Sequence, residues 1–393
     1  MSIRHLATLA TLATLLALGA LPLVAASAQE RSELTLPPNG GNQKSEVTQW
    51  MGLVKATVTY HSPRVHNPPS VDRTGHVWGE LVHFGFFDDG FGPSTATPWR
   101  AGANETTTLT LSHDVLIGGQ PVKAGTYGLF LVVERSGEWS WILSRDASGW
   151  GSFQYNPAQD VARITATPAD APFTEFLTYS FDERRRNGAT LALNWELKRV
   201  ALKIDVPNVL DLYVQQIRKD LLSWPGFDTR NWQKAASFCA NNRVNLDEAL
   251  GWANLAITGP FRGATVGEVS FGSYQVKASV LAAMGRTATA DSTMDEAFEL
   301  PGNDATALYL HGSGLLARQR AERAMRVFRV NGQKHPKDLF WVALGWAEGY
   351  TAAKDTARAI KQWETALRVV PDMMQAQRPT YEASLAALRK GRG

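Results

Sequence analysis

The sequence predicts an antiparallel β-sandwich or barrel domain followed by an α-helical repeat domain. From about residue 50, apolar and polar residues alternate with a period of two, which is typical of strands with one buried face. After Pro207 the apolar residues recur at helical spacing instead. The chain has 393 residues, more than one typical domain. We therefore expect a β domain over residues 50–207 and a helical domain over residues 208–391.

The N-terminus has the pattern of a secretory signal peptide over residues 1–28. Arg4 gives a basic start, the next two dozen residues carry no charge, and Ala26-Ser27-Ala28 fits the cleavage rule. A membrane anchor is the alternative, but Gly19 and Pro22 interrupt the apolar run and no later segment is apolar enough to span a bilayer. We expect cleavage after Ala28, export to the periplasm or the medium, and no membrane span in the mature chain.

Residues 29–49 are polar and rich in Pro and Gly near residue 40, so we expect a flexible lead-in. The first strand candidate follows, where Val54, Ala56, Val58 and Tyr60 share one face. Further strand candidates are residues 75–83, 105–112, 126–134, 138–145, 160–167, 173–182, 189–196 and 199–206. Turn residues separate them at Gly118-Gly119, Ser136-Gly137 and Asn187-Gly188. Many short strands with close turns predict an antiparallel sandwich or barrel.

Helix signals begin directly after Pro207. Asn208 precedes an apolar series at helical spacing and is expected to be its N-cap. Asn245 and Glu248 have the spacing of a capping box before a second apolar series. No strand pattern follows.

Small and aromatic residues then recur in the helical half. Trp341-x2-Leu344-Gly345 is followed by Ala359, Trp363 and Pro371, and an earlier copy has Leu308, Gly312, Ala324, Phe328 and Pro336. The pattern resembles the tetratricopeptide repeat, in which small residues let paired helices approach and aromatic rings fill the gap. Glu348 and Asn331 depart from it, standing where Tyr and Ala are usual. A generic helical bundle is the alternative. The resemblance implies a concave surface that binds a protein or peptide partner.

Three further motifs occur in order within residues 50–207. They are Gly79-Glu80-Leu81-Val82-His83-Phe84-Gly85, Trp99-Arg100-Ala101-Gly102-Ala103-Asn104-Glu105-Thr106-Thr107 and Ala124-Gly125-Thr126-Tyr127. This series resembles the signature of DUF2911, a bacterial family of unknown function. The resemblance implies an exported β domain, in some members with helical repeats behind it. His83 departs from the Pro of the family, and the 86–98 loop is longer than the family usually shows. Since loops of this length often carry function, the loop could alter or cover a family site.

The polar residues of the second motif are the first candidates for a ligand site. Arg100, Asn104 and Glu105 would present a guanidinium, an amide and a carboxylate at a sheet edge, and Arg suits bidentate recognition of carboxylate or phosphate. Tyr127 of the third motif is a further ligand-binding candidate. The structural alternative, which we favour, is that Arg100 and Glu105 pair with each other while Asn104 bonds its own backbone at a turn.

Four of the eight histidines lie close together in the sequence: His61, His66, His76 and His83. Imidazole is a common ligand of divalent metals, but the spacing matches no ligand template. If residues 76–83 form a strand, His76 and Glu80 share a face and His83 points the other way. A divalent metal held by these four side chains is therefore a minor hypothesis, and no other cofactor is expected.

The remaining composition excludes several classes. The sequence lacks G-x-S-x-G, Walker A, H-E-x-x-H, EF-hand and C-x-x-C motifs. A net charge of +3 is too balanced to indicate a nucleic acid partner. Cys239, the one cysteine, is expected to be a buried structural thiol.

The leading function is an exported binding or protein-interaction module without catalysis. The alternative is a hydrolase or metal-dependent enzyme with its site around Arg100, Asn104 and Glu105.

Overall fold

The structure is a computed structural model and describes residues 41–67, 70–259 and 267–391. The expected signal peptide, its cleavage site and most of the expected lead-in lie outside these residues. The chain divides into two compact units, one ending at Asp205 and the other beginning at Val206, with Trp50–Val54 grouped with the second. In the described part of the chain, no helix is both long and apolar enough to cross a bilayer.

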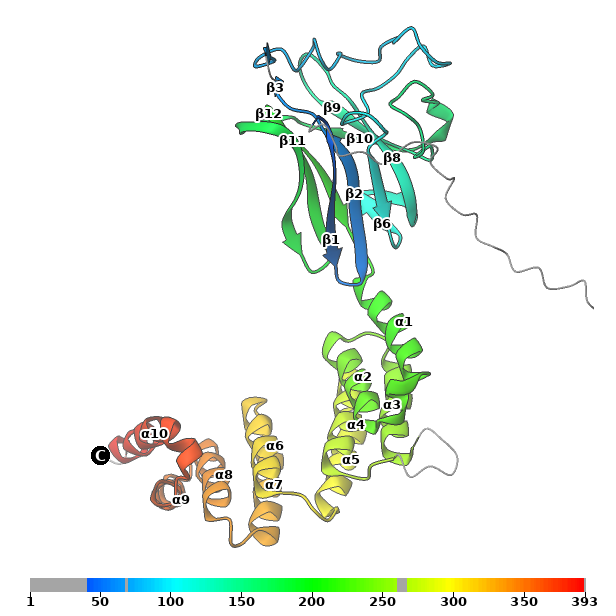
Figure 1. Cartoon of the computed structure of the whole chain (residues 1–393). Coiled ribbons are helices and arrows are strands. Elements are labelled where there is room, and N and C mark those ends of the chain that lie inside the picture. The colour runs from blue at the N-terminus through cyan, green and yellow to red at the C-terminus, as the bar shows by residue number, and fades with distance from the viewer. Residues whose placement is uncertain (1–40, 68–69, 260–266, 392–393) are drawn as a thin grey trace, which may run out of the picture. The chain divides into compact units, whose positions relative to one another are not determined.

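The β unit holds two antiparallel sheets that do not close into a barrel (Figure 1). The larger sheet has the strand order β1-β2-β5-β8-β9-β10. These strands are Gln43–Met51, Val54–Ser62, Thr108–Leu111, Gly125–Val132, Trp139–Ser144 and Asp160–Ala166. The smaller sheet has the order β11-β12-β6-β7, with strands Ala169–Arg185, Gly188–Asp205, Val115–Ile117 and Gln120–Val122. A short pair, β3 (His66–Asn67) and β4 (Val71–Asp72), is separate from both.

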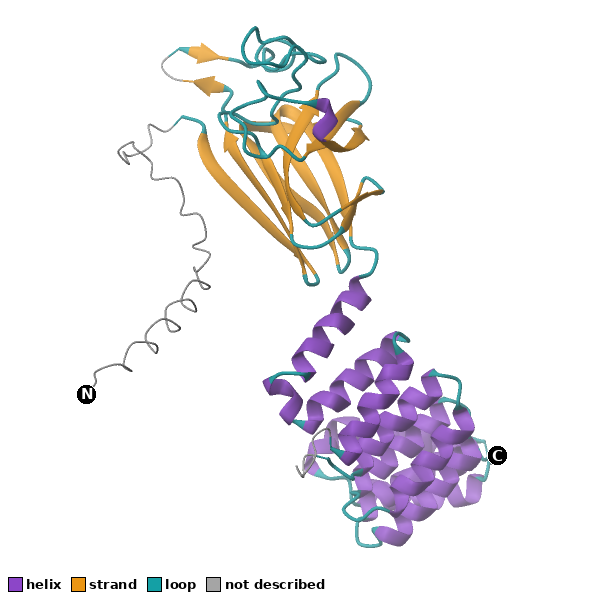
Figure 2. Cartoon of the chain, turned by 90° about the vertical axis from the view of Figure 1, so that its right-hand side faces the viewer, coloured by secondary structure: helices purple, strands orange, loops and turns teal. Residues whose placement is uncertain are grey.

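Side chains of the two larger sheets share one core. Trp141 of β9 donates its indole N–H to the carbonyl of Ala201 in β12 at 3.1 Å. The ring centroids of Tyr60 in β2 and Tyr179 in β11 lie 4.8 Å apart. The expected turn at Gly118-Gly119 joins β6 to β7, and both residues have the positive φ that such a two-residue hairpin requires. The long loops gather at one end of the sheets (Figure 2), and the candidate site described below is made by these loops.

Two expectations for the β domain are wrong. Residues 43–49, which we assigned to the flexible lead-in, form most of β1. β1 is an edge strand with largely exposed side chains, so its sequence carries no run of apolar residues. Residues 75–83 do not form a strand, because Gly75 and Gly79 have φ values of +74° and +98°. The chain turns back there, and the N–H of Val82 bonds the carbonyl of Val77 at 2.8 Å.

From Val206 on, the described residues form helices and the loops that join them, with no strand among them, as the sequence predicts after Pro207. The α-helices α1 to α10 are Val209–Leu221, Thr229–Asn242, Leu246–Thr258, Phe271–Ala283, Thr287–Glu299, Ala305–Ala317, Ala321–Lys334, Leu339–Ala352, Thr356–Arg368 and Arg378–Lys390. Consecutive helices pack as pairs: α2 with α3, α4 with α5, α6 with α7, and α8 with α9. Cys239 in α2 is fully buried, and burial raises the pKa of its thiol to about 11. That matches the expectation of a structural thiol.

Both expected helix caps differ from the prediction. Asn208 precedes α1, but its side chain makes no capping hydrogen bond. Asn245 precedes α3 with a left-handed backbone and likewise makes no side-chain cap. Its amide donates instead to the Glu248 carboxylate at 2.6 Å, so the two residues bond each other and not the backbone.

The small and aromatic residues of the repeat pattern meet around Phe328 of α7. Phe328 is fully buried. A Cβ built on Gly312 of α6 would lie 2.3 Å from its ring, and one on Gly345 of α8 would lie 2.6 Å from it. Only glycine permits such close approach. The glycines therefore let α6 and α8 close over one aromatic ring.

Candidate functional site

The Trp99–Thr107 motif forms a tight loop and not the start of a strand. Ala101 and Asn104 have φ values of +50° and +56°, in the left-handed region that non-glycine residues rarely adopt. The Ala101 carbonyl accepts hydrogen bonds from the hydroxyls of Thr107 at 3.2 Å and Tyr179 at 2.9 Å. These buried bonds hold the loop, and the chain keeps its direction across it, since Trp99 before it and Thr108 after it both pair antiparallel with β8.

Arg100 is the most unusual residue of this loop. Its Nη1 donates to the backbone carbonyl of Asn104 at 2.9 Å, and its guanidinium lies over the Phe153 ring at 5.3 Å from the centroid. Gly151 has a φ of +72°, which favours glycine, and a Cβ there would lie 2.8 Å from the guanidinium carbon. Burial lowers the pKa of Arg100, and the Asp89 carboxylate partly opposes this. Among the described residues, no carboxylate lies within ion-pair distance of this partly desolvated cation.

The guanidinium faces a pocket of about 310 Å³ in the β unit. Its wall is formed by the Trp99 loop, the chain before it and residues from β12. The principal lining residues are Asn42, Arg73, Val82, His83, Asp89, Trp99, Arg100, Asn104, Ser152 and Trp195. Trp99 and Trp195 are stacked with centroids 6.0 Å apart. The indole N–H of Trp195 is buried and has no partner among the described residues.

The structure separates the expected site residues. Arg100 and Asn104 line the pocket, but Glu105 does not, and the expected Arg100–Glu105 pair is absent from the described ion pairs. Glu105 instead lies 3.0 Å from Nε2 of His61. Tyr127 is also outside the pocket: its ring is buried, and its hydroxyl donates to the Lys123 carbonyl at 2.9 Å. The favoured interpretation, that Arg100 and Glu105 pair with each other, is therefore wrong.

Because Arg100 and Glu105 do not pair, the effects of replacing them on the stability of the β unit should be independent. We expect the double-mutant cycle of Arg100→Ala and Glu105→Ala to show a coupling energy within about 0.5 kcal/mol of zero, because the side chains do not touch. Chemical denaturation of the wild type, both single variants and the double variant measures it. A coupling energy above about 1 kcal/mol would show that the two side chains interact after all.

The four histidines do not converge. His66 contacts Glu175 at 2.6 Å, His76 contacts Glu80 at 2.8 Å, and His83 contacts the carbonyl of Gly85 at 3.0 Å. His61 contacts Glu105, as above. In the described part of the chain, no group of three or more His, Cys, Asp or Glu side chains could hold a metal ion. As described, the four histidines therefore do not form the one metal site that the hypothesis requires.

Only His83 of the four lines the pocket. Its ring stacks on Phe87, at 5.3 Å between centroids, and burial lowers its pKa. Because Nδ1 faces the Gly85 carbonyl at 3.0 Å it must donate there, so the neutral ring offers only the lone pair of Nε2.

Sequence reasoning missed Arg73, Asp89 and Trp195 as neighbours of Arg100. Each comes from a different segment, and only the folding of the 75–83 turns and the 86–98 loop brings them together. Trp195 lies within the strand candidate 189–196, which carried no sign of a site. Asp89 belongs to the unusual loop, where it accepts a hydrogen bond from Thr97 at 2.8 Å.

The 86–98 loop also forms one wall of a second pocket, of about 600 Å³. Phe86 contributes a half-exposed ring, beneath which the Arg163 guanidinium lies at 5.6 Å. Arg163 and the Tyr155 hydroxyl both bond Asp160, at 2.8 Å each. The Arg163 charge is therefore already neutralised, in contrast to that of Arg100.

Comparison with known proteins supports one of the two resemblances. A solved structure titled "MamA RS-1 ArsTM double mutant" shares 14% identity, covering 42% of this chain and 96% of that chain, with a TM-score of 0.26. So low a score carries no argument. A comparison with curated proteins finds no match. Residues 42–204, which are nearly the whole β unit, match the family model described as "Protein of unknown function (DUF2911)".

Proposed function

We propose that this protein is an exported binding protein whose β unit holds a small ligand bearing a carboxylate or phosphate. One observation carries the proposal: the Arg100 guanidinium is partly desolvated at the pocket wall without a carboxylate partner among the described residues. Removing a cation from water is costly unless it is paired. A ligand oxyanion in the 310 Å³ pocket would supply the missing charge.

Arg73 adds a second guanidinium to the pocket wall, so two arginines stand against one carboxylate there, that of Asp89. Stacked Trp99 and Trp195 give an apolar wall for the body of the ligand. A nucleophilic hydroxyl would need a base within reach. Ser152, the hydroxyl side chain on the wall, has no histidine or carboxylate hydrogen-bond partner in the described chain, so we propose binding and not hydrolysis.

We further propose that the β unit is a β-sandwich and the helical unit a tetratricopeptide-like array. Support for the sandwich comes from the shared core of the two sheets. Support for the array comes from Gly312 and Gly345, which close on Phe328 at corresponding positions of neighbouring helix pairs. Such an array would bind a segment of a protein or peptide partner.

Thermal unfolding with small anions tests the proposal for the β unit. Phosphate, succinate and glutamate are the probes, and uncharged succinamide is the matched control. A ligand at 100 times its Kd adds about 2.7 kcal/mol, and each kcal/mol raises Tm by roughly 2–4 °C in a unit of this size. We expect at least one anion to raise Tm in the wild type and not in Arg100→Ala.

Arg135→Ala is the matched control variant. Arg135 is exposed, lies over the Phe84 ring at 5.0 Å and is not part of the pocket. It should keep the full anion-dependent shift. Equal anion-dependent Tm shifts in Arg100→Ala and the wild type would mean that the anion does not bind at Arg100.

A further inference from the structure

The helical unit has a crevice of its own, with a volume of about 320 Å³, where the α4–α5 pair meets α6. Residues of four helices form its wall, including Asn241 of α2, Gln275 of α4, Met294 of α5 and His311 and Leu315 of α6. Arg318, which follows α6, stands at its rim. Because Asn241, Gln275 and Arg318 are exposed, the crevice opens to solvent and a chain can enter it.

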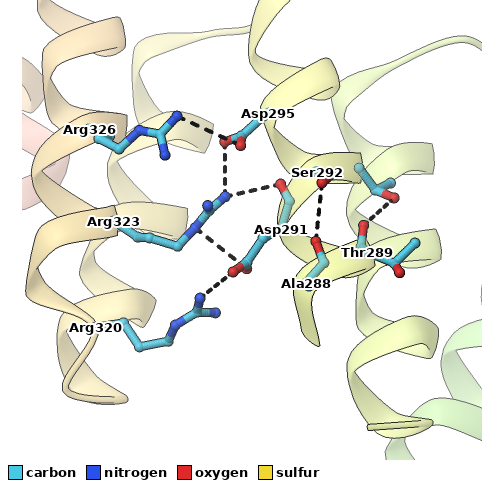
Figure 3. A network of polar contacts seen from close by, with 9 residues as sticks. Ala288, Thr289, Asp291, Ser292, Asp295, Arg320, Arg323 and Arg326 are labelled. Atoms are coloured by element: carbon cyan, nitrogen blue, oxygen red, sulfur yellow. Dashed lines mark hydrogen bonds and ion pairs between the residues drawn. The ribbon is translucent and has the colours of Figure 1, made fainter. Parts of the chain in front are cut away.

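The wall of the crevice carries excess positive charge. Figure 3 shows the ion network beside it, in which Asp291 and Asp295 of α5 face Arg320, Arg323 and Arg326 at the start of α7. Arg320 lies 2.5 Å from Asp291, and Arg323 lies 2.9 Å from Asp295. Three arginines thus face two aspartates, so both carboxylates are fully compensated.

Arg318 adds a cation that this network does not neutralise. In the described part of the chain, the Arg318 guanidinium has neither an ion-pair nor a hydrogen-bond partner. The polar side chains of Asn241 and Gln275 likewise have no protein partner among the described residues. The crevice therefore offers one free guanidinium and two free amides above an apolar floor that includes Leu315 and Met294.

We propose that this crevice binds an acidic side chain of an extended segment of a partner protein, with the carboxylate on Arg318 and the methylenes on Leu315 and Met294. The proposal rests on the proposed role of the helical unit as an interaction module and adds the chemistry of its partner. Charge complementarity selects the carboxylate, because Arg318 is the unpaired charge at the rim. The apolar floor selects a side chain with an aliphatic stem.

Fluorescence anisotropy on the full chain tests this, with labelled hexaglutamate as the probe and labelled hexaglutamine as its uncharged control. We expect hexaglutamate to bind and hexaglutamine to bind at least tenfold more weakly. Arg318→Ala should weaken hexaglutamate binding about tenfold or more, since it removes a charge-assisted hydrogen bond. Arg318→Lys should lie between, because it keeps the charge and loses the planar fork.

Arg329→Ala is the matched control, because Arg329 is an exposed arginine of α7 that does not line the crevice. It should change hexaglutamate binding less than twofold. Equal losses in Arg318→Ala and Arg329→Ala, or no hexaglutamate binding at all, would overturn the proposal. So would free glutamate competing at the same concentration as the peptide, because the ligand would then be a small molecule.

The proposed function and this inference fail separately. A neutral peptide that binds the helical unit independently of Arg318 would leave the interaction module standing and overturn the acidic crevice. A peptide library in which no sequence binds the chain would overturn both.

Discussion

Phe328→Ala is expected to lower the free energy of unfolding of the helical unit by about 3–5 kcal/mol, the usual cost of removing a buried aromatic ring. Phe328 is 1% exposed, and its ring fills the space that Gly312, Gly345 and Gly349 leave open. Since these residues lack side chains, they cannot fill the cavity that alanine would leave. Chemical denaturation followed by circular dichroism in the helical band measures the loss.

Leu310→Ala is the control, because Leu310 lies on α6 and its side chain is 61% exposed. It should change stability by less than about 0.5 kcal/mol. A loss below about 1 kcal/mol for Phe328→Ala would mean that the glycines do not close over this ring.

The second large effect is a loss of stability in acid caused by His311. Burial, and then Arg318, Arg323 and Arg320, lower the pKa of His311 to about 4, while nearby Asp291 raises it slightly. Its ring lies between Phe271 and Phe298, at 6.1 and 5.6 Å between centroids. The folded chain therefore holds this imidazole neutral where the unfolded chain, with an ordinary pKa of about 6.5, would protonate it.

The direction of this pH dependence follows from the different proton binding of the folded and unfolded states. Between pH 6.5 and about 4 the unfolded state binds more protons at His311, so stability is complete above pH 6.5 and falls as the pH is lowered. The expected loss is about 3 kcal/mol by pH 4. Urea denaturation at pH 7, 5.5 and 4 should show a shallower decline in His311→Leu than in the wild type. Parallel declines would show that His311 is not held neutral.

The helices and the close contacts of their small residues could be predicted from the sequence because their signals are local. Gly312, Gly345 and Phe328 stand at fixed spacing within short helices, and the structure brings them into contact. The contacts of the two residues that depart from the repeat pattern could be found only from the structure. Glu348 accepts a hydrogen bond from Tyr309 at 2.7 Å, and buried Asn331 donates to the Ala305 carbonyl at 3.0 Å. At both positions a hydrogen bond stands where the repeat pattern has a packing contact. The spacing of residues in the sequence does not reveal such a bond.

In the β unit, most of the longer strands could be predicted, but the edge strand, the short strands and the loops could not. Alternation finds strands with one buried face, but it misses the edge strand β1 and gives a false strand at residues 75–83. The Arg100–Glu105 pair was expected because both charges stand in one motif, with a turn at Asn104 between them. Ala101 and Asn104 adopt left-handed backbone there, and the resulting loop places Glu105 beside His61 and leaves Arg100 at the pocket.

Titration calorimetry on the full chain tests the central claim, that Arg100 holds an oxyanion in the β-unit pocket. The titrant is the anion that gives the largest thermal shift, added to the wild type, Arg100→Lys, Arg100→Ala and Arg135→Ala. We predict unchanged Kd for Arg135→Ala, a Kd raised about tenfold for Arg100→Lys, and no measurable binding for Arg100→Ala, because a charge-assisted bidentate contact is lost stepwise. Equal Kd values for the wild type and Arg100→Ala would contradict the claim.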